Sequence, residues 1–489
     1  MNINELLIDV PHRGESSAEV KSIEYDSRKA VEGSLFVCLR GANVDGHSFA
    51  LAAYKNGCRL FLCEEIVELP DDAEQFIVSD TRAALAVISA EFYGHPAREL
   101  KLIGLTGTKG KTTTALLINS ILNAHGKNCA YIGSNGILIN GKLSETANTT
   151  PESHVLHKYF RQMVDEGVKY VVLEVSSQAL ARNRVDGIKF DTVVFTNLGE
   201  DHISPVEHPD LEDYRNSKAK LFTDTYGAAY AVYNADDEAS DFMLKCFSGE
   251  RISFAIENNA DYVGRDLDKY RSETALGVSF NCMYDGEEIP TRLMSPGAFS
   301  VYNGLAAMAV CNIYGVDVAS SSATLSHTPV QGRFEIVEAA PGKTFVVDYS
   351  HNGMSLTKAL STLREYEPNR LICVFGSVGG RTQGRRRELA EVASELADYS
   401  IITSDNPDFE DPYAITSEIA SHMKEGSAYE CITDRKEAID RAVEMAQDGD
   451  IVLFAGKGHE TYQLICGKKE PFSERELIVN ACQMAEINA

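Results

Sequence analysis

From Lys101 onward, apolar segments of strand length alternate with amphipathic helical segments, and this alternation restricts the possible folds more than any other feature of the chain. Such a pattern is typical of parallel strands joined by crossover helices. The first series comprises KLIGLTG, KYVVLEV and DTVVFTNL, with helices predicted over Thr112–Ala124 and Leu211–Phe222; a second, after residue 332, comprises KTFVVDYS, RLICVFGS, DYSIITSD and DIVLFAGKG. The sequence therefore predicts an α/β protein with a central doubly wound parallel sheet and a C-terminal Rossmann-like domain.

The first 98 residues follow a different pattern. Short β-rich segments such as SLFVCLR are mixed with Gly turns and one helical stretch, Thr81–Tyr93, which predicts a small α/β module. The chain has 489 residues, 44% of them apolar, which is enough for three packed cores. We therefore place boundaries near residues 98 and 332, giving domains of 1–98, 99–331 and 332–489.

The charge balance excludes some classes of partner. Lys and Arg number 46 against 72 Asp and Glu, so the formal net charge is −26 and the summed field repels nucleic acid and anionic membranes. Any phosphate ligand must be held by a local site. No apolar run reaches the roughly 18 residues of a membrane helix, and the first residues lack the features of a signal peptide. We expect a soluble, cytoplasmic protein.

The cysteines indicate neither disulfides nor a zinc ribbon. Eleven are scattered singly, without a CxxC pair. Most are therefore expected to be small buried hydrophobic residues.

The segment TGTKGKTTT, directly after the strand KLIGL, has the composition of a phosphate-binding loop. Gly107 and Gly110 permit a tight turn of backbone N–H groups, Lys111 can reach phosphates, and the Thr112 hydroxyl can bind Mg²⁺. The loop is shorter than the common GxxxxGK[ST] form, because Leu105 stands where that pattern has its first Gly. The alternative is a Gly-rich turn with incidental lysines, but the strand before and the helix after favour ATP binding.

Further motifs follow this loop in a fixed order: NTTPE (148–152), LEVSSQAL (173–180), VFTNLGEDH (194–202), GRFE, VDYSHN (347–352), SDNP (404–407) and AGKGHETYQ (455–463). In this order they resemble the Mur ligases, and within that family the branch of the muramyl-tripeptide synthetases (MurE type). The segment DSRKAVEGSLFVCLRGANVDGHSF (26–49) is similar to that branch's uridine-binding domain. The likeness covers nearly the whole chain.

The resemblance implies a three-domain, monomeric ligase of peptidoglycan precursor synthesis. Such an enzyme uses ATP and two Mg²⁺ to add an amino acid to the D-Glu of UDP-MurNAc-L-Ala-D-Glu through an acyl phosphate. The ATP and cation chemistry is needed because a carboxylate does not react with an amine at neutral pH. Nucleic acid and membranes are not expected partners.

One carboxylate and one imidazole are expected at the carboxyl edge of the central sheet. Glu174 ends one apolar strand and His202 follows the next, so a doubly wound sheet would place both beside the phosphate loop. Glu174 between apolar neighbours would be a costly buried charge unless it is paired with a cation. By resemblance, Thr112, Glu174, His202 and a carbamylated Lys218 hold metal, and Lys111, Glu174, His202 and Lys218 are the catalytic residues.

The resemblance also implies the binding residues. The following positions match family sites: for ATP, Gly107, Thr108, Lys109, Gly110, Lys111, Thr112, Thr113, Asn303, Arg333, Asp348 and His351; for the uridine and the muramyl peptide, Ser27, His47, Thr149, Thr150, Ser176, Arg182 and Arg184; for the incoming amino acid, Arg381, Asp405, Asn406, Asp408, Gly456 and Glu460.

The choice of amino acid depends on Asp408. Family members that add meso-diaminopimelate carry Arg at this position, where it clamps the second carboxylate. An Asp would instead attract the side-chain ammonium of L-lysine or L-ornithine, and Glu460 would reinforce that preference. We therefore expect L-lysine, with meso-diaminopimelate as the alternative if Arg385 or Arg386 replaces the clamp.

Two other functions remain alternatives. Folylpolyglutamate synthetases share the shortened loop, but they lack the uridine domain that residues 26–49 resemble. A catalytically silent muropeptide-binding regulator could have kept the fold, although the presence of Lys111, Thr112, Glu174, His202 and Lys218 argues against silence.

Overall fold

The computed structural model describes residues 1–488 except 42–43, 201–202, 205–206, 273–275 and 381–382. The chain folds into two compact units. Unit 1 comprises Met1–Tyr262 and Ala306–Val316, and unit 2 comprises Val263–Leu305 and Asp317–Ala489. The boundaries at 98 and 332 stay predictions, since this division follows a different criterion.

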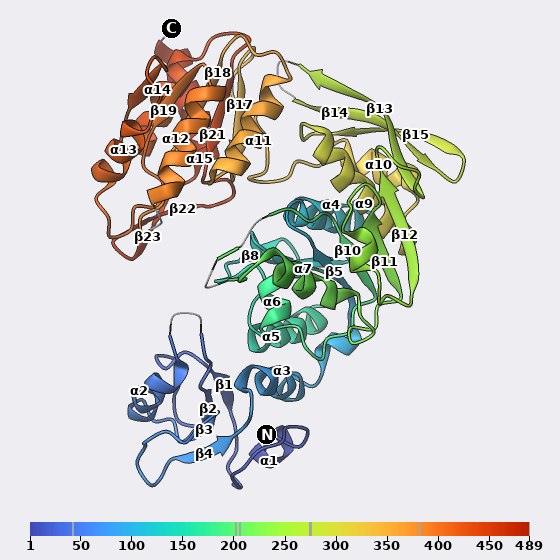
Figure 1. Ribbon diagram of the computed structural model, residues 1–489, viewed down its shortest axis with the longest axis vertical. Coiled ribbons are helices and arrows are strands. Elements are labelled where there is room, and N and C mark those ends of the chain that lie inside the picture. Colours follow the sequence, from blue (N-terminus) through green and yellow to red (C-terminus); the bar gives the residue numbers. More distant parts are fainter. Residues whose placement is uncertain (42–43, 201–202, 205–206, 273–275, 381–382, 489) are drawn as a thin grey trace. The chain divides into compact units, whose positions relative to one another are not determined.

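The N-terminal module is a parallel four-stranded sheet in the order β1-β2-β3-β4 (Figure 1). Its elements are α1 (Ile3–Leu6), β1 (Ser22–Glu24), β2 (Ser34–Val37), η1 (Gly46–Phe49), α2 (Ala50–Lys55), β3 (Leu60–Cys63), β4 (Glu74–Ile77), α3 (Thr81–Phe92) and η2 (Pro96–Glu99). The helix predicted over Thr81–Tyr93 is α3, which begins after Asp80 because that side chain accepts hydrogen bonds from the N–H groups of Arg82 and Ala83.

The central sheet in unit 1 runs β12-β11-β10-β5-β9-β6-β7-β8, parallel from β12 to β6 and antiparallel from β6 to β8. Its elements are β5 (Lys101–Thr106), α4 (Lys111–Ala124), β6 (Cys129–Gly133), β7 (Gly136–Ile139), β8 (Lys142–Ser144), α5 (Ser153–Asp165), β9 (Tyr170–Glu174), α6 (Ser177–Ala181), β10 (Thr192–Phe195), α7 (Leu211–Ala219), η3 (Lys220–Phe222), β11 (Tyr230–Asn234), α8 (Ser240–Met243) and β12 (Glu250–Ala255). The strand order reverses at β5, and ligands of open α/β sheets bind at such a reversal.

Unit 2 contains the antiparallel strands β13 (Tyr262–Arg271, from Val263 onward), β14 (Leu276–Tyr284) and β15 (Glu287–Leu293). It also contains the first part of α9 (Ala298–Ile313), up to Leu305, and all of α10 (Val318–Leu325). The C-terminal sheet runs β16-β17-β21-β18-β19-β20 and is parallel except for β16. Its elements are β16 (Glu335–Val337), β17 (Thr344–Asp348), α11 (Gly353–Arg364), β18 (Leu371–Phe375), α12 (Gln383–Leu396), β19 (Tyr399–Ile402), α13 (Pro412–Ser421), β20 (Tyr429–Cys431), α14 (Arg435–Met445), β21 (Ile451–Ala455), β22 (Tyr462–Ile465), β23 (Lys468–Pro471) and α15 (Glu474–Asn488).

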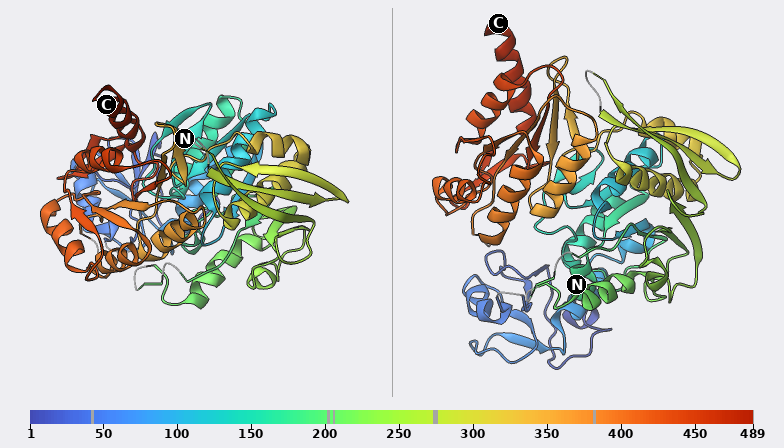
Figure 2. Two further views of the ribbon diagram at one scale, coloured as in Figure 1. Left: turned by 90° about the horizontal axis from the view of Figure 1, so that it is seen from above. Right: turned by 45° about the horizontal axis from the view of Figure 1, so that its top comes forward.

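Helices cover both faces of the C-terminal sheet (Figure 2). Apolar side chains of α11, α12 and α13 pack on one face, and those of α14 and α15 pack on the other. Strands β17, β18, β19 and β21 are therefore buried on both sides and consist of apolar runs, as parallel strands require. This confirms the α/β fold class and the second parallel sheet predicted from the alternation.

Candidate active site

The phosphate loop connects β5 to α4 and is fixed by the segment after β10. Thr108 N–H donates to Asn197 O (2.8 Å), and Thr196 Oγ1 donates to Lys109 O (2.7 Å). Gly107 has φ +150°, and a Cβ there would lie 2.0 Å from Thr196 Oγ1, so no side chain fits at this position. The loop thus forms at the strand reversal, with the first N–H groups of α4 directly behind it.

Both lysines predicted to act in catalysis lie at this loop. Lys111 Nζ donates to Gly107 O (2.8 Å) and Thr108 O (3.2 Å). Lys218, on α7, is 1% exposed; its Nζ donates to the same Gly107 oxygen (2.9 Å) and lies 4.4 Å from the Tyr214 ring centroid. Two ammonium groups from distant segments therefore share one carbonyl, which creates a cationic position beside the turn of the loop.

Glu174 is fully buried at the carboxyl end of β9 and accepts hydrogen bonds at both oxygens. Tyr131 OH (2.6 Å) and Ser134 N–H (3.1 Å) donate to Oε1, and Thr112 Oγ1 (3.0 Å) and Ser134 Oγ (3.3 Å) donate to Oε2. These donors satisfy the hydrogen-bonding capacity of a buried carboxylate. The structure brings Glu174 to Thr112, the first residue after Lys111, as the sheet topology predicts.

The NTTPE segment continues this network. Thr149 Oγ1 lies 3.1 Å from Ser134 Oγ, and Thr150 Oγ1 donates to Glu174 O (2.8 Å). Ser176 caps α6, and its N–H donates to Thr150 Oγ1 (3.0 Å). Three hydroxyl residues predicted to hold the muramyl peptide therefore lie beside Glu174.

Arg184 reaches the same segment through a buried ion pair. Its Nε donates to Glu152 Oε1 (3.0 Å) and its Nη1 donates to Thr150 O (3.1 Å). The other oxygen of Glu152 accepts from Arg82 Nη1 (2.9 Å), at the start of α3. Glu152 and Arg82 are not among the predicted site residues, because an ion pair between residues so far apart leaves no local pattern. Arg182 follows α6, as the C-cap residue.

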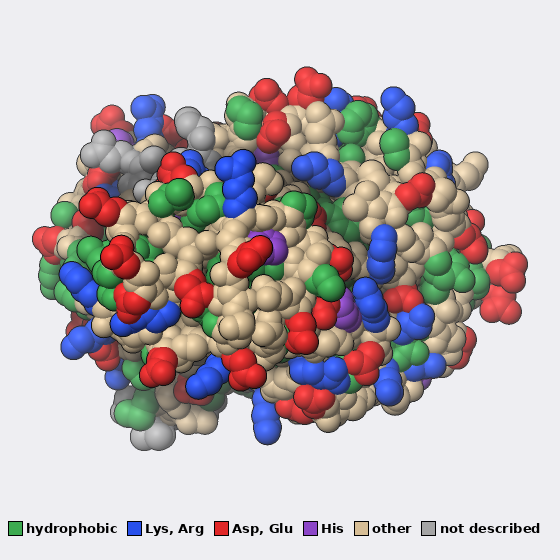
Figure 3. Space-filling view, turned by 90° about the horizontal axis from the view of Figure 1, so that it is seen from below, with side chains coloured by type: hydrophobic (Ala, Val, Ile, Leu, Met, Phe, Trp, Pro, Cys, Tyr) green, Lys and Arg blue, Asp and Glu red, His purple; other side chains and the backbone are tan. Residues whose placement is uncertain are grey.

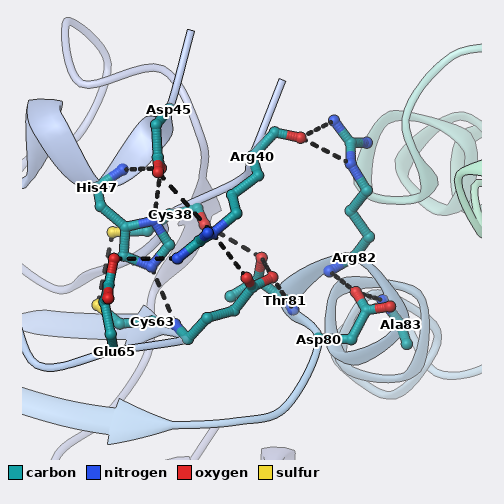
Figure 4. Close-up of polar contacts among 11 residues, drawn as sticks. Cys38, Arg40, Asp45, His47, Cys63, Glu65, Asp80, Thr81, Arg82 and Ala83 are labelled. Carbon is teal, nitrogen blue, oxygen red and sulfur yellow. Dashed lines mark hydrogen bonds and ion pairs between the residues drawn. The ribbon is translucent and has the colours of Figure 1, made fainter. Parts of the chain in front are cut away.

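The two predicted uridine residues lie in the N-terminal module. Ser27 O accepts from Asn56 Nδ2 (2.8 Å). His47 is buried, and both ring nitrogens are engaged: Nδ1 lies 2.6 Å from Asp45 Oδ1, and Nε2 accepts from Glu64 N–H (2.9 Å) (Figure 4).

The sulfurs of Cys38 and Cys63 lie 3.5 Å apart beside His47, and the three side chains form a buried cluster with metal-ligating atom types (Figure 4). Because both nitrogens of His47 already have hydrogen-bond partners, we interpret the cluster as a packed core rather than as a metal site.

Three of the predicted ATP residues of unit 2, Arg333, Asp348 and His351, lie on two segments that contact each other. Asp348 is buried at the end of β17, where its carboxylate accepts from Phe334 N–H (2.9 Å) and from the Ser350 hydroxyl. The Arg333 guanidinium lies 4.6 Å from the Tyr349 ring centroid. His351 Nδ1 lies 2.8 Å from Tyr349 O, and burial lowers the pKa of this imidazole. Asn303 is buried on α9.

The predicted amino-acid residues converge at the carboxyl edge of the C-terminal sheet. Asn406 Nδ2 donates to Glu460 Oε2 (2.9 Å), and Gly456 N–H donates to Asp348 O (3.0 Å). Asp405 is buried, and its Oδ2 would lie 2.9 Å from a Cβ at Gly456. These residues come from two loops about 50 positions apart, so only the folded sheet brings them together.

Asp408 has a structural contact that the sequence did not predict. It adopts φ +53°, and its Oδ1 accepts from Gly467 N–H (2.7 Å), which attaches the loop to the β22–β23 hairpin. Its carboxylate is thus engaged in a turn. Arg386, one of the two possible substitute clamps, is held by Glu410 (2.7 Å) and Glu418 (2.5 Å). Arg385 is half-buried at the start of α12.

Two predicted residues, His202 and Arg381, lie outside the described residues.

On the face shown in Figure 3, acidic and basic side chains are intermixed, in keeping with a phosphate site made locally by the loop. In the described part of the chain, no helix combines the length and apolar character needed to cross a membrane.

Three family models match the chain in order: "Mur ligase family, catalytic domain" over residues 19–93, "Mur ligase middle domain" over 105–311 and "Mur ligase, glutamate ligase domain" over 332–458. A UDP-N-acetylmuramoyl-L-alanyl-D-glutamate–2,6-diaminopimelate ligase of Clostridium botulinum is 38% identical over 486 residues, covering 98% of this chain and 99% of the relative.

The chain is also similar to solved structures. A UDP-N-acetylmuramoyl-L-alanyl-D-glutamate–2,6-diaminopimelate ligase matches with a TM-score of 0.68 and 29% identity, covering 99% of both chains. Folylpolyglutamate synthase of Mycobacterium tuberculosis, complexed with ADP, matches with a TM-score of 0.61 and 17% identity, covering 77% of this chain and 91% of that one. The second match shows a shared fold alone.

Proposed function

Because the chain belongs to the Mur ligase family, we propose that it joins meso-diaminopimelate to the D-Glu of UDP-N-acetylmuramoyl-L-alanyl-D-glutamate. The chain is an ATP-dependent, ADP-forming ligase of peptidoglycan precursor synthesis. The observation that carries the choice of substrates is the full-length similarity to relatives named for this reaction. On this proposal the N-terminal domain binds uridine, the central domain ATP, and the C-terminal domain the amino acid, in a cytoplasmic monomer.

In this proposal the phosphate loop orients ATP for attack by the D-Glu carboxylate. Backbone N–H groups at the start of α4 bind the phosphates, and the Lys111 ammonium offsets negative charge on the transferring phosphoryl group. The carboxylate oxygen bonds to the γ-phosphorus and ADP leaves, which gives an acyl phosphate. The amine of the incoming amino acid then attacks its carbonyl: the C–N bond forms, the C–O bond to phosphate breaks, phosphate leaves, and the nitrogen loses a proton. Residues Gly107 to Thr113 supply this part of the site.

The donors beside the loop fit Mg²⁺. Thr112 Oγ1 and the Glu174 carboxylate lie 3.0 Å apart, and both are hard oxygen ligands of the kind that magnesium prefers. A bound Mg²⁺ would offset charge on the phosphates. We propose that Thr112 and Glu174 hold one such ion and that His202 and Lys218 contribute to a second.

We propose that Lys218 acts as a carbamate, as the family resemblance implies. Its Nζ lies against Gly107 O in a buried position. Carbamylation replaces a cation by an anion with two oxygens, which would turn this position from a donor into a ligand for a metal ion.

The substrate residues follow from the same resemblance. Thr149, Thr150 and Ser176 lie beside Glu174, and Arg184 contacts Thr150 O. We propose that these four residues bind the carboxylates and pyrophosphate of the muramyl peptide, with Arg182 nearby in sequence. We further propose that Ser27 and His47 contact the uridine, that Asn303, Arg333, Asp348 and His351 contact ATP, and that Arg381, Asp405, Asn406, Gly456 and Glu460 bind the amino acid.

L-Lysine is the second candidate for the amino acid, because Asp408 stands where diaminopimelate-adding members carry Arg. The bond from Gly467 N–H to one oxygen of the Asp408 carboxylate gives this residue a structural role in the turn, which accounts for an Asp here without a substrate ammonium. Arg385 and Arg381 are then the candidates for binding the second carboxylate.

The test is ADP release with UDP-N-acetylmuramoyl-L-alanyl-D-glutamate and each amino acid, measured on one preparation. We expect kcat/KM for meso-diaminopimelate to exceed that for L-lysine by more than tenfold, since a lost charge pair in a closed site costs about 2 to 5 kcal/mol. A preference for L-lysine would reverse the assignment, and Asp408→Arg should then depress lysine use. No turnover with any amino acid would instead favour a silent binding protein.

A further inference from the structure

Lys457 has a fully buried side chain in the loop between β21 and β22. Its Nζ donates to Asn406 Oδ1 (2.8 Å) and to Glu460 Oε2 (2.8 Å), and lies 3.7 Å from Asp405 Oδ1. The Tyr462 ring centroid lies 5.3 Å away. A buried ammonium must be balanced by such partners, because a buried charge is otherwise costly.

These contacts fix the orientation of the Asn406 amide. Its Oδ1 accepts from Lys457 Nζ and from Leu464 N–H (2.9 Å), so its Nδ2 must face the other way, toward Glu460 Oε2 (2.9 Å). Reversing the amide would place its N–H₂ group against two donors. The lysine therefore determines which face of Asn406 meets Glu460.

The same contacts divide the two oxygens of Glu460. Oε2 receives both donors, whereas Oε1 accepts no hydrogen bond from the residues that the structure describes. Asp405 Oδ1 is likewise buried without a hydrogen-bond donor among those residues. Two carboxylates thus face one ammonium, and the group carries one excess negative charge. A ligand ammonium would balance that charge and supply donors to the two open oxygens.

We propose that Lys457 is a positioning residue for the incoming amino acid: it holds Asn406 and Glu460 so that the carboxylates receive the substrate's ammonium, without touching the substrate itself. This inference rests on the proposed function, because it names the support of the same amino-acid pocket.

The test separates formation of the acyl phosphate from its capture. Hydroxylamine, a small nucleophile, can attack the acyl phosphate carbonyl in place of the amino acid; a hydroxamate forms and phosphate leaves. ADP release is measured once with hydroxylamine and once with varied meso-diaminopimelate or L-lysine. If the wild-type protein releases no ADP in either assay, the proposed function is refuted, and the role of Lys457 is refuted with it.

For Lys457→Met we expect the KM of the preferred amino acid to rise at least tenfold, while hydroxylamine-dependent ADP release and the KM of ATP stay within about twofold. Lys457→Gln keeps a hydrogen-bond donor without the charge, so its KM for the amino acid should lie between those of wild type and Lys457→Met. Lys469→Met is the matched control: this exposed lysine lies 4.0 Å from the centroid of the same Tyr462 ring, and its loss should change nothing.

Equal losses in the amino-acid and hydroxylamine assays would show that Lys457 only stabilises the fold, and would overturn the inference. An unchanged KM in Lys457→Gln and Lys457→Met would do the same. If Lys457→Met does not fold, Lys457→Gln decides between these outcomes.

Discussion

The phosphate loop and the amino-acid pocket are built in opposite ways. In the loop, Lys111 contacts carbonyls three and four residues before it, and the segment after β10 braces the turn. In the pocket, Asn406 meets Lys457 and Glu460 across about 50 residues of chain. The loop carries its lysine and its turn within one consecutive motif, whereas the pocket exists only where distant loops meet. Changes in the two regions should therefore have separable effects.

The largest effect is expected for Lys111→Met. This change keeps the backbone donors of the loop but removes the charge beside the transferring phosphoryl group. We expect kcat to fall by about 10²-fold or more, as similar electrostatic deletions do. The measurement is ADP release with saturating substrates, and the loss should be equal with the amino acid and with hydroxylamine. Near-normal ADP release would remove Lys111 from the ATP site.

Lys218→Ala should also be close to inactive, because the carbamate or ammonium at Gly107 O disappears. Its neighbour Lys220 is exposed and provides the matched control, since Lys220→Ala should be mild. If a carbamate supplies the anionic charge, added formate or acetate should partly restore ADP release to Lys218→Ala. Activity equal to wild type would eliminate Lys218 from the mechanism; inactivity without rescue would eliminate the carbamate.

The two regions also differ in how far the sequence predicted them. The strand before and the helix after TGTKGKTTT appear as expected at β5 and α4, with α4 one residue earlier than predicted. The convergence of Glu174 on Thr112 also follows from strand topology, because both lie at the carboxyl edge of adjacent parallel strands. These features depend on local periodicity and on general rules of α/β sheets.

The partners of charged groups could not be predicted in this way. Sequence assigned Asp408 to the substrate, but its bond to Gly467 depends on the β22–β23 hairpin folding back on the loop. Similarly, Arg184 shares Glu152 with Arg82, a contact between α3 and the segment before α5. No residue spacing encodes such contacts, since they require the relative placement of segments that are far apart in the chain.

A moderate effect, confined to the amino-acid pocket, is expected for Gly456→Ala. Gly456 has φ +113°, and the added Cβ would lie 2.9 Å from Asp405 Oδ2, so that carboxylate must move. We expect the KM of the amino acid to rise about tenfold, which corresponds to a loss of about 1.4 kcal/mol in binding free energy. Hydroxylamine-dependent ADP release should stay close to wild type.

The matched control for Gly456→Ala is Gly426→Ala. Gly426 has φ +87° with no atom within 4 Å of the added Cβ, so it carries the backbone strain of about 1 to 2 kcal/mol without the collision. Equal KM values in the two variants would show that Asp405 is not part of the pocket.

The smallest effect on turnover is expected from changes at two buried histidines of α5. Their protonation should affect the stability of the fold instead. Whereas Glu174 beside the loop has four donors, His157 has no hydrogen-bond partner for either ring nitrogen among the described residues. Burial, and to a smaller degree the neighbouring His95 and His154, lowers the pKa of His157 to about 4; burial, with Lys158 and Lys29, lowers that of His154 to about 4.

Because the folded-state pKa lies below the unfolded value of about 6.5, the unfolded chain binds more protons once the pH falls below 6.5. The free energy of unfolding should therefore fall between pH 6.5 and about 4, by roughly 1.4 kcal/mol per pH unit for each histidine. Urea unfolding at pH 7.5 and 5.5 measures this loss. His157→Leu cannot take up a proton, so the loss should shrink by about 1.4 kcal/mol, whereas His125→Gln, at an exposed position, should leave it unchanged. If His157→Leu lost as much stability on acidification as wild type, protonation of this ring would not limit stability. The difference between the unpartnered His157 ring and the fully hydrogen-bonded Glu174 would then have no energetic consequence.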